Sequence, residues 1–279
     1  MFKKPLRIFS TIGVFLLLGI LLSPSFQDYR IVLGPSQTLT HDNLTRRYLL
    51  GPVPKNPARI LLALPGYNDR PRFMAYYTGL HNSLPADTLV VYAQARTDEE
   101  KGRGWNAKIC CGAGYFNEVD DVGYLSRLIE TLRREHAAPD TPVYVAGFSN
   151  GAMMAQHLAG ERPDLLAGVI AHAGPLGADG TEITLEKPVP VRLSHGRADR
   201  RLPFAGTVDT PERFDGWLAF ETSVARWQTN NGQEVPVVAE AYLDLAHEWP
   251  DWRILRVWHR RPTGSRHVAD FIAQVESKL

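Results

Sequence analysis

Cysteine is scarce in this sequence of 279 residues: there are two, and they are neighbours, Cys110 and Cys111. With no histidine close to them in the sequence, they make a poor zinc site. Neighbouring Cα atoms lie closer than in ordinary disulfides, so the sequence leaves open whether the pair is bridged or consists of two free thiols.

Excess charge and internal repetition are absent as well. The formal net charge is +1, which gives no electrostatic reason to expect nucleic acid or an acidic surface as a partner. No repeat and no low-complexity segment is found, which excludes solenoids. What remains is an ordinary globular composition, 44% hydrophobic and 22% charged.

One long hydrophobic run stands near the N-terminus, "IFSTIGVFLLLGILL" at residues 8–22, after Lys3, Lys4 and Arg7. It is short for a membrane-spanning helix, which needs about 20 apolar residues. A basic segment followed by an apolar one is typical of a secretory signal. We therefore predict a signal peptide at residues 1–25 and a secreted or periplasmic protein. An uncleaved N-terminal anchor is the alternative.

Apolar strand-like segments alternate with helix-like ones along residues 26–279. "ARILLALPG", "TLVVYAQ", "PVYVAG", "LAGVIAHAG", "VPVRLSHG", "VPVVAEAYL" and "RILRVWH" resemble strands. Helical spacing is found in "NEVDDVGYLSRLIETLRREH", "NGAMMAQHLAGERP", "ERFDGWLAFETSVARWQTNNG" and "HVADFIAQVESKL". This alternation predicts one α/β domain, with a mostly parallel sheet covered by helices on both faces.

Ser149 lies in a G-x-S-x-G pattern, between the strand-like "VYVA" and the helix-like "AMMAQHLA". A tight turn between a strand and a helix lifts such a serine above the sheet, and Gly147 and Gly151 avoid a collision across that turn. The pattern predicts a nucleophile. The alternative is a serine that only caps the helix.

In this arrangement the chain order is serine, acid, histidine. Asp199 follows the strand "VRLSHG" and is the best-placed acid, since sites of such sheets form at the carboxyl ends of strands. Less well placed are Asp164, Asp179, Asp209 and Asp215.

Of the nine histidines, the order leaves three candidates for the base. His267 follows the loop "RRPTGS" and opens the last helix, so we predict it as the base. His247, in "LAHEWPD", is the main alternative, and His259 directly ends a strand-like segment. The backbone amides of Asn150, next to the serine, and Tyr67, in the loop "LPGYNDR", are the predicted oxyanion donors.

Substrate selection is expected to depend on residues 95–116. Trp105 and Tyr115 there would form either an aromatic wall or part of the core.

From about residue 45 onward, the chain resembles the esterase family that includes polyhydroxybutyrate depolymerase-type enzymes, feruloyl esterases and acetylxylan esterases. The likeness is carried by "LTRRYLLGPVP", "GWNAKICCG", "VDDVGYLSRLI", "VYVAGFSNGAMMAQHLA", "PDLLAGVIAHAGPL" and "SHGRADRRLPF". It implies an α/β-hydrolase fold, with Ser149, Asp199 and His267 at the triad positions and Tyr67 and Asn150 as oxyanion donors.

The chain departs from that family at two site segments. Pro65-Gly66 stands in place of His-Gly after the early strand. The family's Gly-His-x-Trp-Pro motif is absent at His267 and is partly echoed in "AHEWPD" at His247.

The sequence thus predicts an exported carboxylic ester hydrolase that uses a serine, a histidine and an aspartate and needs no metal or organic cofactor. Its partner would be a small or polymeric ester. Contact with a membrane is expected only through an uncleaved N-terminal segment, and the oligomeric state stays open. A serine peptidase of similar fold and a non-catalytic polymer-binding protein are the alternatives.

Overall fold

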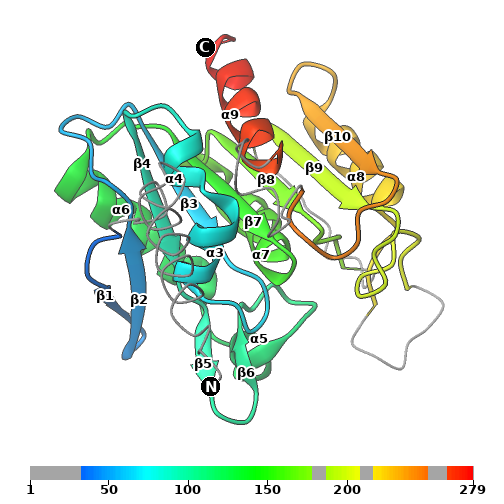
Figure 1. The fold of residues 1–279 in the computed structure, drawn as a ribbon, viewed down its shortest axis with the longest axis horizontal. Coiled ribbons are helices and arrows are strands. Elements are labelled where there is room, and N and C mark those ends of the chain that lie inside the picture. The colour runs from blue at the N-terminus through cyan, green and yellow to red at the C-terminus, as the bar shows by residue number, and fades with distance from the viewer. Residues whose placement is uncertain (1–32, 178–186, 208–215, 251–262, 279) are drawn as a thin grey trace, which may run out of the picture. The chain divides into compact units, whose positions relative to one another are not determined.

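A central sheet of eight strands organises the structure, a computed structural model that describes residues 33–177, 187–207, 216–250 and 263–278 (Figure 1). In spatial order the strands are β1 (Gln37–His41), β2 (Leu44–Leu50), β4 (Thr88–Ala93), β3 (Arg59–Leu64), β7 (Val143–Phe148), β8 (Gly168–His172), β9 (Val191–Gly196) and β10 (Val237–Tyr242). Strands from β4 to β10 are mutually parallel, whereas β1 and β2 pair antiparallel. The predicted mostly parallel sheet is confirmed.

Continuous apolar sequence explains why the middle strands are buried on both faces. All six residues of β4 are buried, and residues 60–64 of β3 are fully shielded from solvent. Strands of this kind need helices on both sides, since neither face can meet water.

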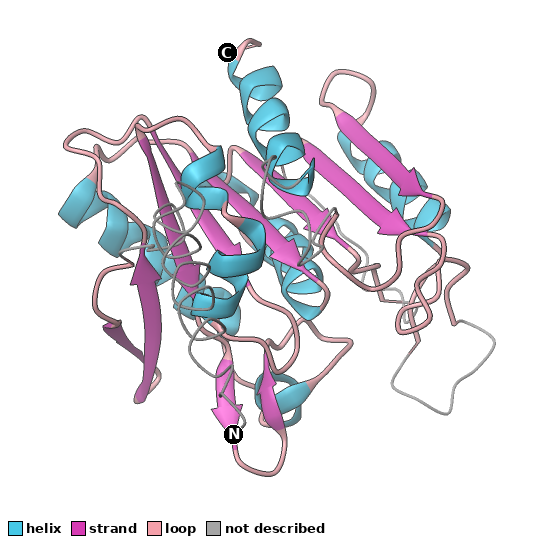
Figure 2. Ribbon diagram, in the orientation of Figure 1, coloured by secondary structure: helices cyan, strands magenta, loops and turns pink. Residues whose placement is uncertain are grey.

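Helices lie on both faces of the sheet (Figures 1 and 2). One face carries α3 (Pro71–Thr78), α4 (Leu80–Ser83) and α9 (Thr263–Glu276), and the other α6 (Asp121–His136), α7 (Asn150–Glu161) and α8 (Phe220–Asn231). Shorter elements are α5 (Gly112–Phe116), η1 (Pro163–Leu165) and the antiparallel pair β5 (Arg96–Asp98) and β6 (Gly102–Gly104). Within the described ranges, no helix is both long and apolar enough to cross a membrane.

Several elements differ from the sequence prediction, and two of them show why. The strand β1 was not expected, because it is a polar edge strand without an apolar run. The helix expected from residue 212 begins at Phe220 instead. Trp217 forms a β-bridge with Gly177, and the amide of Leu218 donates to the carbonyl of Leu176 at 2.8 Å, so this segment is extended.

Some predictions lie outside the described residues. These are the N-terminal leader at residues 1–25 and the strand "RILRVWH" at residues 253–259. They stay predictions.

The parallel order determines where a site can form. The strands β7, β8, β9 and β10 are successive neighbours, so their carboxyl ends meet at one edge of the sheet. The segments that follow β7, β9 and β10 contain Ser149, Asp199 and His247.

Candidate active site

Ser149 occupies the sharp turn between β7 and α7, with φ 54° and ψ −125°. A positive φ is unfavourable for a residue with a side chain, and such strain is found at functional sites. The flanking glycines make the turn possible. A methyl group on Gly147 would collide with the carbonyl of Gly151, and one on Gly151 with the carbonyl of Leu64.

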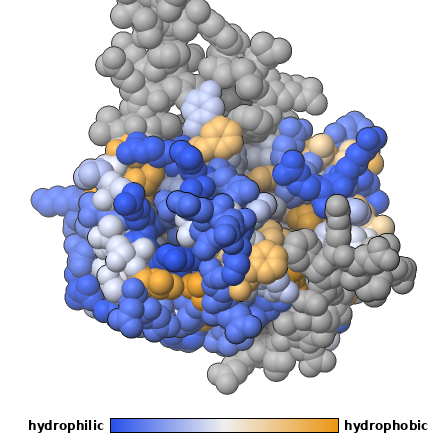
Figure 3. Space-filling model, turned by 90° about the horizontal axis from the view of Figure 1, so that it is seen from below, coloured by the Kyte–Doolittle hydropathy of each residue, from blue (hydrophilic) through white to orange (hydrophobic). Residues whose placement is uncertain are grey.

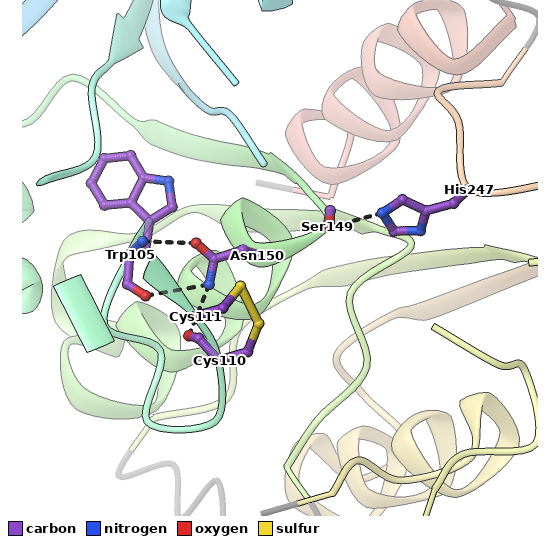
Figure 4. Close-up of a disulfide and its surroundings, with 6 residues drawn as sticks. All are labelled: Trp105, Cys110, Cys111, Ser149, Asn150 and His247. Atoms are coloured by element: carbon purple, nitrogen blue, oxygen red, sulfur yellow. Dashed lines mark hydrogen bonds between the residues drawn. A yellow bond between two sulfur atoms is a disulfide. The ribbon is translucent and has the colours of Figure 1, made fainter. Parts of the chain in front are cut away.

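His247 connects Ser149 to Asp199. Its Nε2 lies 2.8 Å from Ser149 Oγ, and its Nδ1 lies 2.7 Å from Asp199 Oδ2. Because a carboxylate only accepts hydrogen bonds, Nδ1 carries the proton and the lone pair of Nε2 faces the serine hydroxyl. This is the arrangement of a nucleophile, a general base and an orienting acid. Figure 4 shows the contact between the serine and the imidazole.

His267 is not part of this group, which corrects the sequence-based choice of base. It lies in α9, where its Nδ1 is 2.9 Å from the hydroxyl of Tyr242 and 3.2 Å from a carboxylate oxygen of Glu240. His259, the third candidate, lies outside the described residues.

The physical reason is the path of the chain after β10. This strand pairs with β9, and the two continue together past their ends. The amide of Arg197 donates to the carbonyl of Tyr242 at 2.8 Å, and that of Ala198 to Leu245 at 3.2 Å. The segment after β10 is therefore fixed beside Asp199, and His247 reaches the acid two residues later.

Asp199 is buried and fully occupied by donors. Its Oδ1 accepts from the amides of Arg201 at 2.8 Å and Leu202 at 2.9 Å. Its Oδ2 faces both His247 and the Nε2 of His195, the latter at 3.3 Å. Burial alone would raise the pKa of Asp199, but hydrogen bonds from His195 and His247 bring it below its usual range. The carboxylate is thus held ionised.

Of the competing acids, only Asp164 lies in the described part of the chain, and it is engaged elsewhere. Asp164 pairs with Arg162 on the surface at 2.8 Å. Asp179, Asp209 and Asp215 lie outside the described residues.

The segments of both predicted oxyanion donors lie close to Ser149. Asn150 follows it at the start of α7, and Gly66, which precedes Tyr67, approaches so closely that an added methyl would lie 3.2 Å from Ser149 Cβ. In the described part of the chain, neither amide donates to a protein acceptor. Their catalytic use stays a prediction.

Trp105 forms hydrogen bonds to the two segments that contain the predicted oxyanion donors Tyr67 and Asn150. Its indole nitrogen donates to the carbonyl of Pro65 at 2.9 Å, and its backbone amide to Asn150 Oδ1 at 2.7 Å. The residue is fully buried, so it belongs to the core rather than to the aromatic wall that was its alternative.

Cys110 and Cys111 form a disulfide, which settles the question that the sequence left open. The side-chain amide of Asn150 donates to the carbonyl of Cys110 at 2.9 Å and to that of Trp105 at 3.3 Å (Figure 4). The bridge is thereby connected to the residue that follows the nucleophile.

A cavity of about 560 Å³ opens at Ser149, within the size range of small-molecule sites. Both cysteines line it, and Asp69, whose pKa burial raises, contributes a polar group. Its aromatic lining includes Tyr67, Phe73, Phe116, Phe148, Trp217 and Trp249. Tyr115, the other residue expected to form a wall, is not among the lining residues. The molecular face seen in Figure 3 shows small apolar patches among polar side chains.

Among the described residues, one group of side chains has the spacing to bind a cation: His41, Asp42 and Asp120. None of them lines the cavity at Ser149. His41 already contacts Asp120 at 2.8 Å, and Asp120 caps α6 through the amide of Gly123. This group has no geometric connection to the serine site.

The fold is that of the α/β-hydrolases, as its likeness to solved structures shows. Esterase PE8 has a TM-score of 0.56 at 19% identity, covering 81% of this chain and 97% of its own. Acyl-protein thioesterase 2 of Zea mays has a TM-score of 0.55 at 15% identity, covering 82% and 98%.

Sequence comparison points in the same direction. Residues 120–238 match the model of the Phospholipase/Carboxylesterase family. NocK of Nocardia uniformis subsp. tsuyamanensis, a protein called an esterase by name, is 30% identical over 173 residues, or 60% of this chain. The matched region spans about half of that relative, 49% of its length.

Proposed function

We propose that this protein is a serine carboxylic ester hydrolase in which Ser149, His247 and Asp199 form the catalytic triad. The observation that carries the proposal is the pair of contacts of His247, 2.8 Å to the serine oxygen and 2.7 Å to the aspartate. The carboxylesterase family match and the esterase relative support the same reaction class.

In the proposed reaction, Ser149 Oγ attacks the ester carbonyl while His247 Nε2 accepts its proton. The amides of Tyr67 and Asn150 stabilise the negative oxygen of the tetrahedral intermediate. His247 then gives the proton to the leaving alcohol, and an acyl-enzyme remains. Water attacks this ester with the same histidine as base, and the acid is released. Asp199 keeps the imidazole in the required tautomer and stabilises its charged form.

The substrate proposed is an ester with an apolar or aromatic group, of the feruloyl, acetyl or hydroxybutyrate type. The aromatic lining of the cavity supports this, as does the resemblance of "GWNAKICCG" and "SHGRADRRLPF" to esterases that act on such compounds. Export to the periplasm or the medium is proposed from the basic and apolar N-terminal sequence, with membrane anchorage as the alternative.

The test of the reaction class uses short-chain p-nitrophenyl esters and a fluorophosphonate probe that labels activated serines. The wild-type protein is expected to hydrolyse the ester and to be labelled, and Ser149→Ala to do neither. Equal hydrolysis by both proteins would refute the nucleophile. Hydrolysis of peptide amides in preference to esters would favour the peptidase.

The choice of base is tested by a matched pair of variants. His247→Ala is expected to lower kcat by roughly 10⁴-fold or more, as loss of a triad member does. His267→Ala, which changes a histidine bonded to Tyr242, is expected to keep kcat within about threefold, because no transition-state contact is lost. The reverse result would return the role to His267.

A further inference from the structure

A second histidine, His172, lies at the centre of the triad region without touching Ser149 Oγ. It ends β8, the strand between β7, which presents the serine, and β9, which leads to the acid. In the sheet it is paired with Phe148 on one side and Ser194 on the other. Its side chain is 1% exposed, so its polar atoms must find partners within the protein.

His172 contacts a segment next to each member of the triad. Its carbonyl accepts the amide of Ser149 at 2.9 Å. Its Nδ1 lies 2.8 Å from the hydroxyl of Ser194, which is in the strand before Asp199. Its Nε2 lies 2.8 Å from the carbonyl of Glu248, the residue after His247.

These partners determine the tautomer of His172. A backbone carbonyl can only accept, so Nε2 must carry the proton and donate it to Glu248. The lone pair of Nδ1 then accepts from the hydroxyl of Ser194. Burial lowers the pKa of His172 to about 3, so the ring stays neutral when the triad works.

Packing against neighbouring rings fixes the plane of the His172 imidazole and thereby the direction of its Nε2–H donor. Phe148 lies nearly parallel to His172, with 5.9 Å between centroids and 12° between planes. Trp249 packs edge-on at 5.7 Å. Phe148 also contacts the ring of His247 at 5.1 Å, so the two histidines share a neighbour.

We propose that His172 is a positioning residue: by donating to the carbonyl of Glu248, it holds the segment after β10 where His247 reaches Ser149. This inference rests on the proposed function of the triad. His172 itself does not exchange a proton with the substrate. Its contribution is to keep the catalytic imidazole in place, since a displacement of about 1 Å in such a group costs up to roughly 100-fold in rate.

The test compares two replacements of His172. Phenylalanine can pack against Phe148 and Trp249 as the imidazole does but cannot donate to Glu248. We therefore expect His172→Phe to lower kcat roughly 10- to 100-fold with KM within about twofold. His172→Gln retains an N–H donor and is expected to recover part of the loss. The matched control is His81→Phe, because His81 is a half-buried histidine whose Nδ1 lies 2.7 Å from the hydroxyl of Tyr92. Since the hydrogen-bond partner of His81 is Tyr92 and not a residue of the triad, this variant is expected to leave kcat unchanged.

The proposal is overturned if His172→Phe keeps the wild-type kcat, or if His81→Phe loses as much. It is also overturned if the glutamine variant shows no recovery. Should His172→Phe fail to fold, ¹⁵N NMR of the wild-type imidazoles decides the question. A protonated Nε2 at His172 is expected, and a protonated Nδ1 contradicts the proposal.

The rate of fluorophosphonate labelling separates this inference from the function itself. A wild-type protein that is labelled but hydrolyses no ester would refute the esterase proposal alone. The ratio of labelling rates between wild type and His172→Phe would still measure the effect of His172. Equal rates would refute the positioning role even if the protein is an esterase.

Discussion

Replacing Arg46 by methionine should destabilise this protein more than the loss of any surface ion pair. Arg46 is 3% exposed and Asp121 1%, and Nη2 of the arginine lies 2.6 Å from Asp121 Oδ1. The guanidinium also stacks over the ring of Tyr124 at 4.2 Å. The other carboxylate oxygen accepts from the amide of Asn106 at 2.7 Å, so this pair joins β2, α6 and the chain beside Trp105.

The magnitude of the loss of stability follows from the carboxylate of Asp121, which the substitution leaves buried and unpaired. Removing one partner of a buried ion pair costs about 3–5 kcal/mol, because the remaining charge is desolvated without compensation. Loss of the cation–π contact adds roughly 0.5–2 kcal/mol. In Arg46→Met/Asp121→Asn the uncompensated charge is gone, so we expect the double variant to be more stable than the sum of both single losses predicts, by about 2 kcal/mol or more.

Urea unfolding at neutral pH provides the assay, and Arg162→Met is the control. Arg162 pairs with Asp164 at 2.8 Å, but the two side chains are 35% and 59% exposed, so its loss should cost less than about 1 kcal/mol.

The penalty in Arg46→Met should also shrink in acid. Burial already raises the pKa of Asp121, and without the arginine it rises further. A folded-state pKa above the unfolded one makes the folded state bind more protons, so its relative stability increases as the pH falls. A loss below about 1 kcal/mol, or simple additivity in the double variant, would refute this reasoning.

Two further predictions concern histidine and the disulfide. Because burial lowers the pKa of His172 to about 3, the unfolded chain takes up a proton below about pH 6.5 that the folded chain does not, so the free energy of unfolding should fall by about 2 kcal/mol between about pH 7.5 and 5. His172→Phe should remove this part of the slope in urea titrations, and an unchanged slope would contradict it. A bridge between neighbours closes almost no loop, so Cys110→Ser/Cys111→Ser should shift Tm by only a few degrees at most, while its place in the cavity wall should change KM for esters. A large loss of Tm together with an unchanged KM would contradict this prediction.

The sequence was most informative where local rules decide the geometry. Gly147, Ser149 and Gly151 form a motif in which a few neighbouring residues determine the backbone conformation of the turn. Its placement between β7 and α7 is confirmed. Asp199 lies three residues after the end of β9, so the end of a strand was enough to find it. The continuous apolar segments of β3 and β4 likewise identified the buried strands.

The histidine could not be found by the same means, because its position depends on which strand is the neighbour of β9. Reading residues 253–259 as the last strand moved the expected base to the following loop. The available signal was "HEWP" at His247, which resembles the family motif: Trp249 packs against His172 and lines the cavity. His172 itself gave no signal, since a histidine at the end of an apolar strand has no distinctive sequence context.

The backbone of Ser149 has a consequence for how this protein balances stability against activity. At φ 54° and ψ −125°, glycine would be the relaxed residue, and a serine there costs on the order of 1 kcal/mol or more. Replacing Ser149 by glycine would relieve this strain and stabilise the folded state, but it would remove the hydroxyl. The fold therefore retains backbone strain at the residue that we propose as the nucleophile, whose hydroxyl the proposed reaction requires.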